Sequence, residues 1–219
     1  MRRLRTLNSF GRIGIGGQPW GWRGGSGTGG SGIPYVHFDT FTDTPGVLLP
    51  AHTPEIGGPY IDRSGGWAID INNAYVPNIA IADPRVTAPG IADGTAEVML
   101  RTSQVAGSFM GMLIREAANE SAILVELEWP AAGGSISAYT RSAAGAYGLL
   151  GTTGALGLLA ATDYKLTLVF AGTAIDAFLD DVPVLSVISA FNQTETRFGM
   201  RSDTGTHIGG RFDLLTLRP

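Results

Sequence analysis

The chain alternates apolar and polar residues in four separate stretches, and this period of two constrains the fold more than any other feature of the sequence. In residues 122–129, for example, Ile123, Val125 and Leu127 alternate with polar or charged positions. Successive side chains of a β-strand point to opposite faces, so such a stretch has one apolar and one polar face. We therefore expect an all-β protein, with half-buried strands in 95–102, 108–116, 122–129 and 163–170.

Turn-forming residues separate these strands. Residues 92–95, 131–135, 171–173 and 179–183 contain the glycine, aspartate and proline that hairpins require. The helical candidate 115–122 is short and lies between two strands, so we expect a hairpin loop there. Roughly eleven to fourteen strands follow from this pattern, which indicates two antiparallel sheets packed face to face.

The N-terminal region has a different composition. Residues 11–32 contain eleven glycines and two tryptophans, and a free segment of this kind is flexible. We expect an extended glycine-rich arm in residues 1–34 and a β-sandwich domain in residues 35–219. Because the arm has no core of its own, its larger side chains are expected to anchor it in a partner. The predicted anchoring residues are Arg12, Ile13, Ile15, Trp20, Trp22 and Arg23.

The charge balance bears on the kind of partner. Charged residues make up 16% of the chain and the net charge is −4, which argues against nucleic acid as a partner, since a clustered basic face is its usual footprint. Only the arm is basic, and its arginines are expected to pair with acidic protein surface. The weakly charged surface as a whole suggests contact with other protein.

Cysteine is absent from the chain, so neither a disulfide nor a thiolate metal site is expected. The charged start is not followed by the apolar run of about 7 to 15 residues that a secretory signal has. No stretch approaches the roughly 18 apolar residues of a membrane span. We expect synthesis in the cytoplasm, no membrane insertion and no cofactor.

The order of the strand segments resembles the concanavalin A-like lectin/glucanase superfamily in its laminin G-like form. The resemblance covers about residues 36–218 and rests on order and spacing rather than on one motif. It implies a two-sheet antiparallel jelly-roll β-sandwich. The segments that carry it are "DTFTDTPGVLLPAHTPEIGG", "SFMGMLIRE", "AILVELEW", "DYKLTLVFAGTAIDAFLDDVPVLSV" and "RFGMRSDTGTHIGGRFDLLTLRP".

The opening of the domain, residues 38–58, is also similar to jelly-roll domains of bacteriophage virion proteins. This resemblance implies a non-enzymatic structural protein of a phage or phage-like particle, such as a capsid decoration, head fibre or tail accessory protein. The arm would tether the sandwich to capsid or tail proteins and to further copies of the chain. The expected location is the virion.

A carbohydrate-binding module is the alternative function. Glycan recognition would use aromatic faces around one end of the sandwich, and four tyrosines lie in or near turns. Trp67 alternates with Ile69 and Ile71 and is therefore expected in the core instead. The candidate glycan-binding residues are Tyr60, Tyr75, Tyr139 and Tyr147.

A glycoside hydrolase is the third alternative. Glu126 and Glu128 lie two apart on one strand, so they point to the same side about 7 Å apart, and paired carboxylates are what glycoside hydrolysis requires. Glucanases of the resembled family carry a pattern like Glu-x-Asp-x-x-Glu, and this chain lacks both the Asp and the third acid. We expect a solvated strand face here and no catalytic residues.

Two further groups of residues are weighed as ligands and set aside. Some relatives in the resembled family bind Ca²⁺ through clustered carboxylates, but aspartates in tight turns usually hydrogen-bond to backbone. The histidines lie far apart with no ligand spacing, so no metal site is predicted, and Ca²⁺ bound by the aspartates stays the minor alternative. The residues concerned are Asp39, Asp43, Asp180, Asp181 and Asp203, and His37, His52 and His207.

Overall fold

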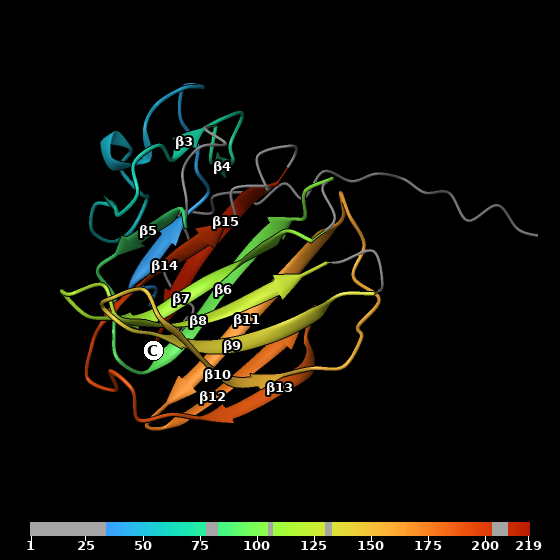
Figure 1. Cartoon of the computed structure of the whole chain (residues 1–219). Helices are drawn as coiled ribbons and strands as arrows, with labels where there is room; N and C mark the ends of the chain where they lie inside the picture. Colours follow the sequence, from blue (N-terminus) through green and yellow to red (C-terminus); the bar gives the residue numbers. More distant parts are fainter. Residues whose placement is uncertain (1–33, 78–82, 105–106, 130–132, 203–209) are drawn as a thin grey trace, which may run out of the picture. The chain divides into compact units, whose positions relative to one another are not determined.

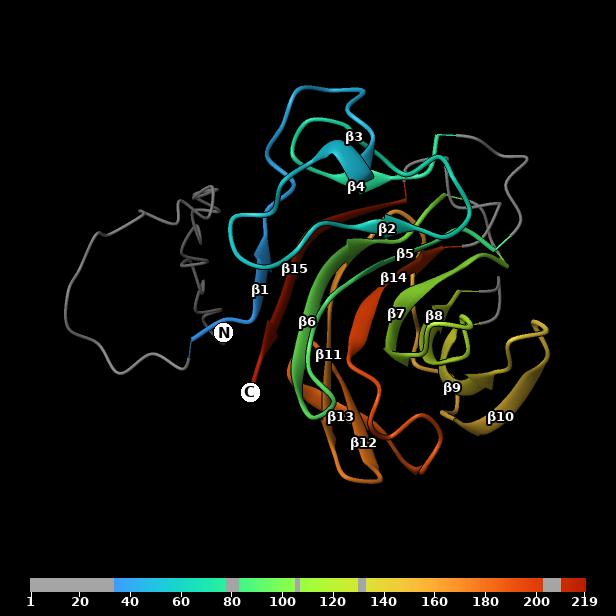
Figure 2. The ribbon, with the colours of Figure 1, turned by 90° about the vertical axis from the view of Figure 1, so that its left-hand side faces the viewer.

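Two antiparallel sheets make up the β-sandwich in this computed structural model, which describes residues 34–77, 83–104, 107–129, 133–202 and 210–219. Figure 1 shows one sheet in front of the other, and Figure 2 shows the two layers from the side. The prediction of an all-β, two-sheet antiparallel jelly-roll sandwich is confirmed.

One sheet has eight strands, and the long strands β6, β11 and β15 form its centre. Its spatial order is β13 (Val182–Ile188), β12 (Ala174–Leu179), β11 (Asp163–Ala171), β6 (Gly94–Arg101), β15 (Arg211–Arg218), β4 (Ala74–Tyr75) and β3 (Ala68–Ile69), and β1 (His37–Asp39) also pairs with β15.

The other sheet has seven strands and carries the groove described below. Its spatial order is β10 (Tyr147–Thr152), β9 (Ser135–Arg141), β8 (Ala122–Glu128), β7 (Phe109–Glu116), β14 (Arg197–Ser202), β5 (Arg85–Ala88) and β2 (Ile61–Asp62). A 3-10 turn, η1 (Leu49–Ala51), lies between β1 and β2.

The core lies between the sheets and follows the alternation seen in the sequence. Val98 and Leu100 of β6 and Leu168 of β11 face Val125 and Leu127 of β8, and all are at most 1% exposed. Burying each such side chain stabilises the fold by about 1.5–3 kcal/mol. Trp67, expected in the core, is fully buried with its ring centroid 5.6 Å from that of Phe212.

The expected hairpin at 115–122 is present. β7 ends at Glu116 and β8 begins at Ala122, and between them the Ala117 N–H donates to the Ser121 carbonyl at 2.9 Å. Glu120 has a positive φ of 67°, so the chain reverses tightly instead of forming a helix.

The predicted arm falls on residues that are not described, apart from Pro34 at its end. The anchoring residues Arg12, Ile13, Ile15, Trp20, Trp22 and Arg23 all lie outside the described part, so the arm and its boundary with residues 35–219 stay predictions. Within the described part, no helix is long and apolar enough to cross a membrane.

Candidate functional site

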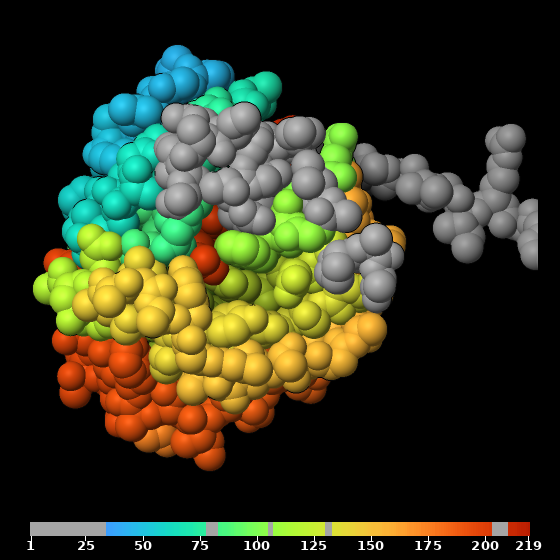
Figure 3. Space-filling model, viewed as in Figure 1, coloured from blue at the N-terminus to red at the C-terminus, as the bar shows by residue number. Residues whose placement is uncertain are grey.

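A groove of about 470 Å³ lies on the outer face of the seven-stranded sheet. Figure 3 views this face, which is hollowed where β7, β8 and β14 pass beside the yellow β9–β10 segment. Strand alternation explains much of the lining, because Glu126, Glu128 and Ser137 each lie between two chain neighbours that point into the core. The lining residues are Phe109, Glu126, Glu128, Ser137, Tyr139, Tyr147 and Arg201.

Cross-strand register brings residues distant in sequence into one row across the groove. Arg201 of β14 pairs with Gly111 of β7, Gly111 pairs with Glu126 of β8, and Glu126 pairs with Ser137 of β9. The row ends at Thr152 of β10, whose hydroxyl accepts a hydrogen bond from the Ser137 hydroxyl at 2.9 Å. Four residues with polar side chains therefore line one straight path across the sheet.

Gly111 is the one residue of this row without a side chain. A Cβ built at Gly111 would lie 2.1 Å from the Val125 carbonyl oxygen of the neighbouring strand, so no larger residue fits there without moving backbone. Gly111 lies between Arg201 and Glu126 in this row, and the guanidinium of Arg201 forms its ion pair with the carboxylate of Glu126 across it.

Arg201 is the best-connected side chain of the groove. Its Nε donates to Asp83 at 2.6 Å and its Nη2 to the Tyr147 hydroxyl at 3.0 Å, while Nη1 is ion-paired with Glu126. Its Cζ lies 4.4 Å from the ring centroid of Phe109 and 5.1 Å from that of Tyr147. Stacking of this kind fixes a guanidinium plane and orients both rings.

Asp83 fixes the arginine of the groove and two further arginines by ion pairs. Its carboxylate is ion-paired with Arg85, Arg141 and Arg201 at 3.1, 3.2 and 2.6 Å. Desolvation alone would raise the pKa of Asp83, but the charge of Arg201, followed by those of Arg85 and Arg141, brings it below its usual value. The three arginines are thus held by one ionised acid.

The aromatic rings of the groove come from neighbouring strands. The rings of Tyr139 and Tyr147 meet edge to face with centroids 6.3 Å apart. Tyr139 packs on a small apolar cluster on this outer face that contains Leu113 and Leu124, whereas the Tyr147 residue is 45% exposed. The pair gives the groove a firm apolar wall with one open face.

The two carboxylates of β8 differ in their surroundings. Glu126 is 5% exposed and ion-paired with Arg201. Glu128 is partly exposed, and within the described part of the chain its side chain makes no hydrogen bond or ion pair. The prediction of a solvated face bearing two acids therefore holds for Glu128 and is wrong for Glu126, because Gly111 lets an arginine reach it.

The other two tyrosines predicted for glycan binding do not join the groove. Tyr60 is 3% exposed and its hydroxyl donates to Asp39 at 2.7 Å, so its ring is unavailable to a ligand. Tyr75 lies on β4 of the eight-stranded sheet. Sequence position near a turn did not distinguish these two from Tyr139 and Tyr147.

Two histidines thought to be isolated belong to one buried network. His37 Nε2 lies 2.9 Å from the Tyr60 hydroxyl, and His52 Nε2 and Nδ1 lie 3.0 Å from Asp39 and Asp43. Burial lowers the pKa of His37 to about 4. Burial also acts to lower the pKa of His52, but its hydrogen bonds to Asp43 and Asp39 raise it overall. The network ties β1 to the segment 40–60.

The aspartates weighed as calcium ligands have structural partners. Asp180 accepts a hydrogen bond from the Lys165 backbone N–H at 2.9 Å, and Asp181 is ion-paired with the Lys165 amine. Both have positive φ in the β12–β13 turn. Among the described residues, no three His, Asp or Glu are grouped as a metal site. Asp203 and His207 lie outside that part of the chain.

Comparison with solved structures finds the same fold in several proteins of low sequence identity. The carbohydrate-binding module CBM66 of Bacillus subtilis is similar over 74% of this chain and 97% of its own, with a TM-score of 0.58 and 14% identity. The β-glucanase of Bacillus licheniformis matches over 83% and 97%, with a TM-score of 0.56 and 9% identity. The xylan β-1,4-xylosidase of Bacillus halodurans matches over 89% and 41%, with a TM-score of 0.60 and 13% identity.

The class defined by these likenesses is the concanavalin A-like jelly roll, so the predicted resemblance is confirmed for the fold. Neither a protein-family model nor a curated protein sequence matches the chain. The prediction of a non-enzymatic protein is corrected, because a glucanase and a xylosidase have this fold, which is compatible with hydrolase activity. The virion role receives no support from the comparisons.

Proposed function

We propose that the protein binds a glycan in the groove of the seven-stranded sheet. The observation that carries this proposal is the meeting of the Tyr139 and Tyr147 rings with charged and hydroxyl side chains along one hollow. Sugar rings present apolar C–H faces and hydroxyl edges, which match an aromatic wall beside carboxylate and guanidinium groups. The fold of carbohydrate-binding modules and glucanases supports the same ligand class.

Titration of the protein with laminaritriose, laminaritetraose and xylan-derived oligosaccharides tests this proposal, since one protein of similar fold forms a complex with the first two and another is a xylan β-1,4-xylosidase. Removing the ring of Tyr139 by Tyr139→Ala should weaken binding by at least about tenfold, as loss of a central aromatic contact does. Tyr35→Ala is the matched control, because Tyr35 packs on Phe38 away from this sheet. If Tyr139→Ala and Tyr35→Ala bound these oligosaccharides with equal affinity, glycan binding in the groove would be contradicted.

Glycoside hydrolysis is the second candidate, and a specific observation favours it. Glu126 and Glu128 both line the groove, and Glu126 is ion-paired with Arg201 while Glu128 stays accessible. Two carboxyl groups beside one sugar-sized hollow are the arrangement that glycosidases use. Release of reducing ends from soluble glucans or xylans should then be lost in Glu128→Gln with binding retained. If the wild-type protein binds these glycans without cleaving them, this second candidate fails and the first stands.

A further inference from the structure

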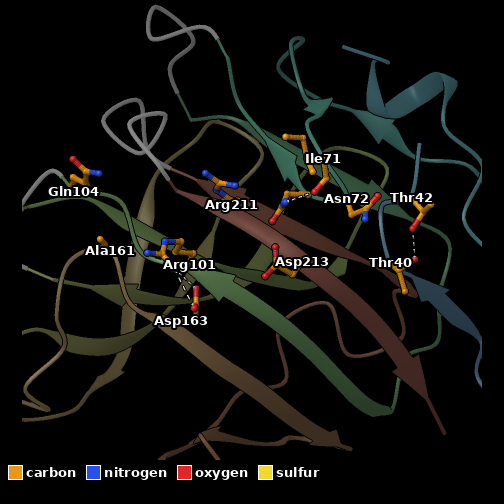
Figure 4. A pocket seen from close by; sticks show the side chains of 11 residues that line it. Thr40, Thr42, Ile71, Asn72, Arg101, Gln104, Ala161, Asp163, Arg211 and Asp213 are labelled. Atoms are coloured by element: carbon orange, nitrogen blue, oxygen red, sulfur yellow. Dashed lines mark hydrogen bonds and ion pairs between the residues drawn. The ribbon is translucent and has the colours of Figure 1, made fainter. Parts of the chain in front are cut away.

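A second hollow of about 670 Å³ lies on the outer face of the eight-stranded sheet. Its floor is a row across three strands, in which Asp163 of β11 and Arg211 of β15 both pair with Arg101 of β6. Figure 4 shows these side chains on the sheet with Asn72 and Thr40 beyond Asp213. The groove proposed above lies on the other sheet, so the two sites share no lining residue.

A β-bulge in β15 places Asp213 in this hollow. The pairing of β15 with β6 shifts between Phe212 and Leu214, so Asp213 is the extra residue. Phe212 and Leu215 both point into the core at 1% and 0% exposure, and the bulge lets two consecutive residues between them face outward. Bulges often re-aim a side chain at a functional site.

The polar groups of the hollow are close enough to act together. Desolvation and then the charge of Asp163 raise the pKa of Asp213, while Arg211 and Arg101 act in the opposite direction. Arg101 holds Asp163 at 3.0 Å. Within the described residues, the side chains of Asp213 and Arg211 make no hydrogen bond or ion pair, so their donors and acceptor oxygens are available to a ligand.

The rim of the hollow is strained. Ile71 and Asn72 form the two-residue β3–β4 turn with φ of 46° and 64°, and Asp70 and Asn73 exchange backbone hydrogen bonds at 2.8 and 3.1 Å. A β-branched residue rarely adopts positive φ, and such strain is concentrated at functional sites. The Ile71 residue is 68% exposed, which leaves an apolar surface beside the polar floor.

We infer that this hollow is a second binding site, for a neutral polyhydroxylated ligand of the glycan class. Two arginines and two aspartates give the lining no net formal charge, which favours neither an anion nor a cation. Guanidinium and amide N–H groups next to carboxylates provide donors and acceptors for adjacent hydroxyls. Ile71 offers the apolar contact that a sugar ring also makes. This inference does not depend on the groove.

The test follows the backbone amide signals of the full-length, ¹⁵N-labelled protein by NMR during titration with neutral gluco-, xylo-, fructo- and galacto-oligosaccharides. At least one sugar should give saturable shifts at Asn72, Asn73 and Arg101. Asp213→Ala should weaken this binding by about tenfold or more. Asp176→Ala on β12 of the same sheet is the matched control and should leave it unchanged.

Variants of the groove distinguish binding in the second hollow from binding in the groove. Tyr139→Ala should not change binding at Asn72 and Arg101, even if it abolishes binding in the groove, and failure of the groove alone leaves the second site standing. The inference is overturned if no neutral sugar gives saturable shifts at these amides. It is also overturned if, in a parallel titration with anionic oligosaccharides, only these give such shifts, or if Asp213→Ala and Asp176→Ala have equal effects.

Discussion

At the scale of single residues, Arg201 holds the groove together. It joins Asp83, Glu126 and the rings of Phe109 and Tyr147 while its own side chain is 6% exposed. A buried charge that loses its partner is costly because neither water nor another ion replaces it. The positions of the groove residues therefore depend on this one guanidinium.

Arg201→Ala should lower the free energy of unfolding by about 3–5 kcal/mol, because it leaves two acids on the sheet without their closest cation. Arg101→Ala provides the control, since the exposed ion pair of Arg101 with Asp163 contributes only about 0–1 kcal/mol. Urea unfolding of both variants measures the difference. A loss below about 1 kcal/mol for Arg201→Ala would show that the cluster is not cooperative.

His37 gives stability a distinct pH dependence. Its folded pKa of about 4 lies below the usual 6.5, so between these values the unfolded chain binds a proton that the folded chain does not. Its contribution is fully present above pH 6.5 and falls by up to about 3 kcal/mol as the pH drops towards 4. His52 acts over a different pH range. Because its pKa is raised in the folded protein, its contribution to stability is fully present below pH 6.5 and is lost as the pH rises above that value. Denaturant midpoints from pH 7 to 4 should fall less steeply in His37→Gln than in the wild type.

At the scale of elements, register and turn geometry set the shape of both hollows. The close approach of β7 to β8 requires glycine at 111. Gly111→Ala should destabilise the protein by about 2 kcal/mol, since its Cβ would meet the Val125 carbonyl at 2.1 Å. Gly154→Ala has open space around it and should change thermal stability by less than about 0.5 kcal/mol. Equal melting temperatures for the two variants would contradict this account of the groove floor.

In the β3–β4 turn, a substitution should stabilise the protein instead of destabilising it. Ile71→Asn places a residue that tolerates positive φ in the strained position and should raise the free energy of unfolding by about 1 kcal/mol. Leu48→Asn is the control, because Leu48 is also exposed but has an ordinary φ of −71°. Thermal unfolding measures both variants. If Ile71→Asn were no more stable than Leu48→Asn, backbone strain at Ile71 would be contradicted.

The sequence predicts strands well where apolar and polar residues alternate regularly. It predicts less well the contacts, bulges and turns that shape the two hollows. The period of two in 122–129 places Glu126 and Glu128 on the outer face, as found. The partner of Glu126 is Arg201, which lies far along the chain and meets it only through the pairing of β7 with both β8 and β14. The bulge at Asp213 and the Ile-Asn turn carry none of the usual glycine signals, so no local pattern identifies them.

At the scale of the whole molecule, the described part of the sandwich has a hollow on the outer face of each sheet. The groove combines aromatic rings with charged groups, whereas the second hollow is more polar and charge-balanced. The fold alone is shared by binding modules and hydrolases, so the side chains of the outer faces decide the function. The predicted arm and virion location concern how the sandwich is attached and are independent of either site.

A crystal structure of the protein with laminaritetraose or a xylan-derived oligosaccharide at saturating concentration tests the central claim most directly. The account predicts a sugar ring against Tyr139 and Tyr147, with hydroxyls within hydrogen-bond distance of Glu128 and Arg201. An empty groove in crystals whose packing leaves it open, together with no change of the groove amides in solution, would contradict it.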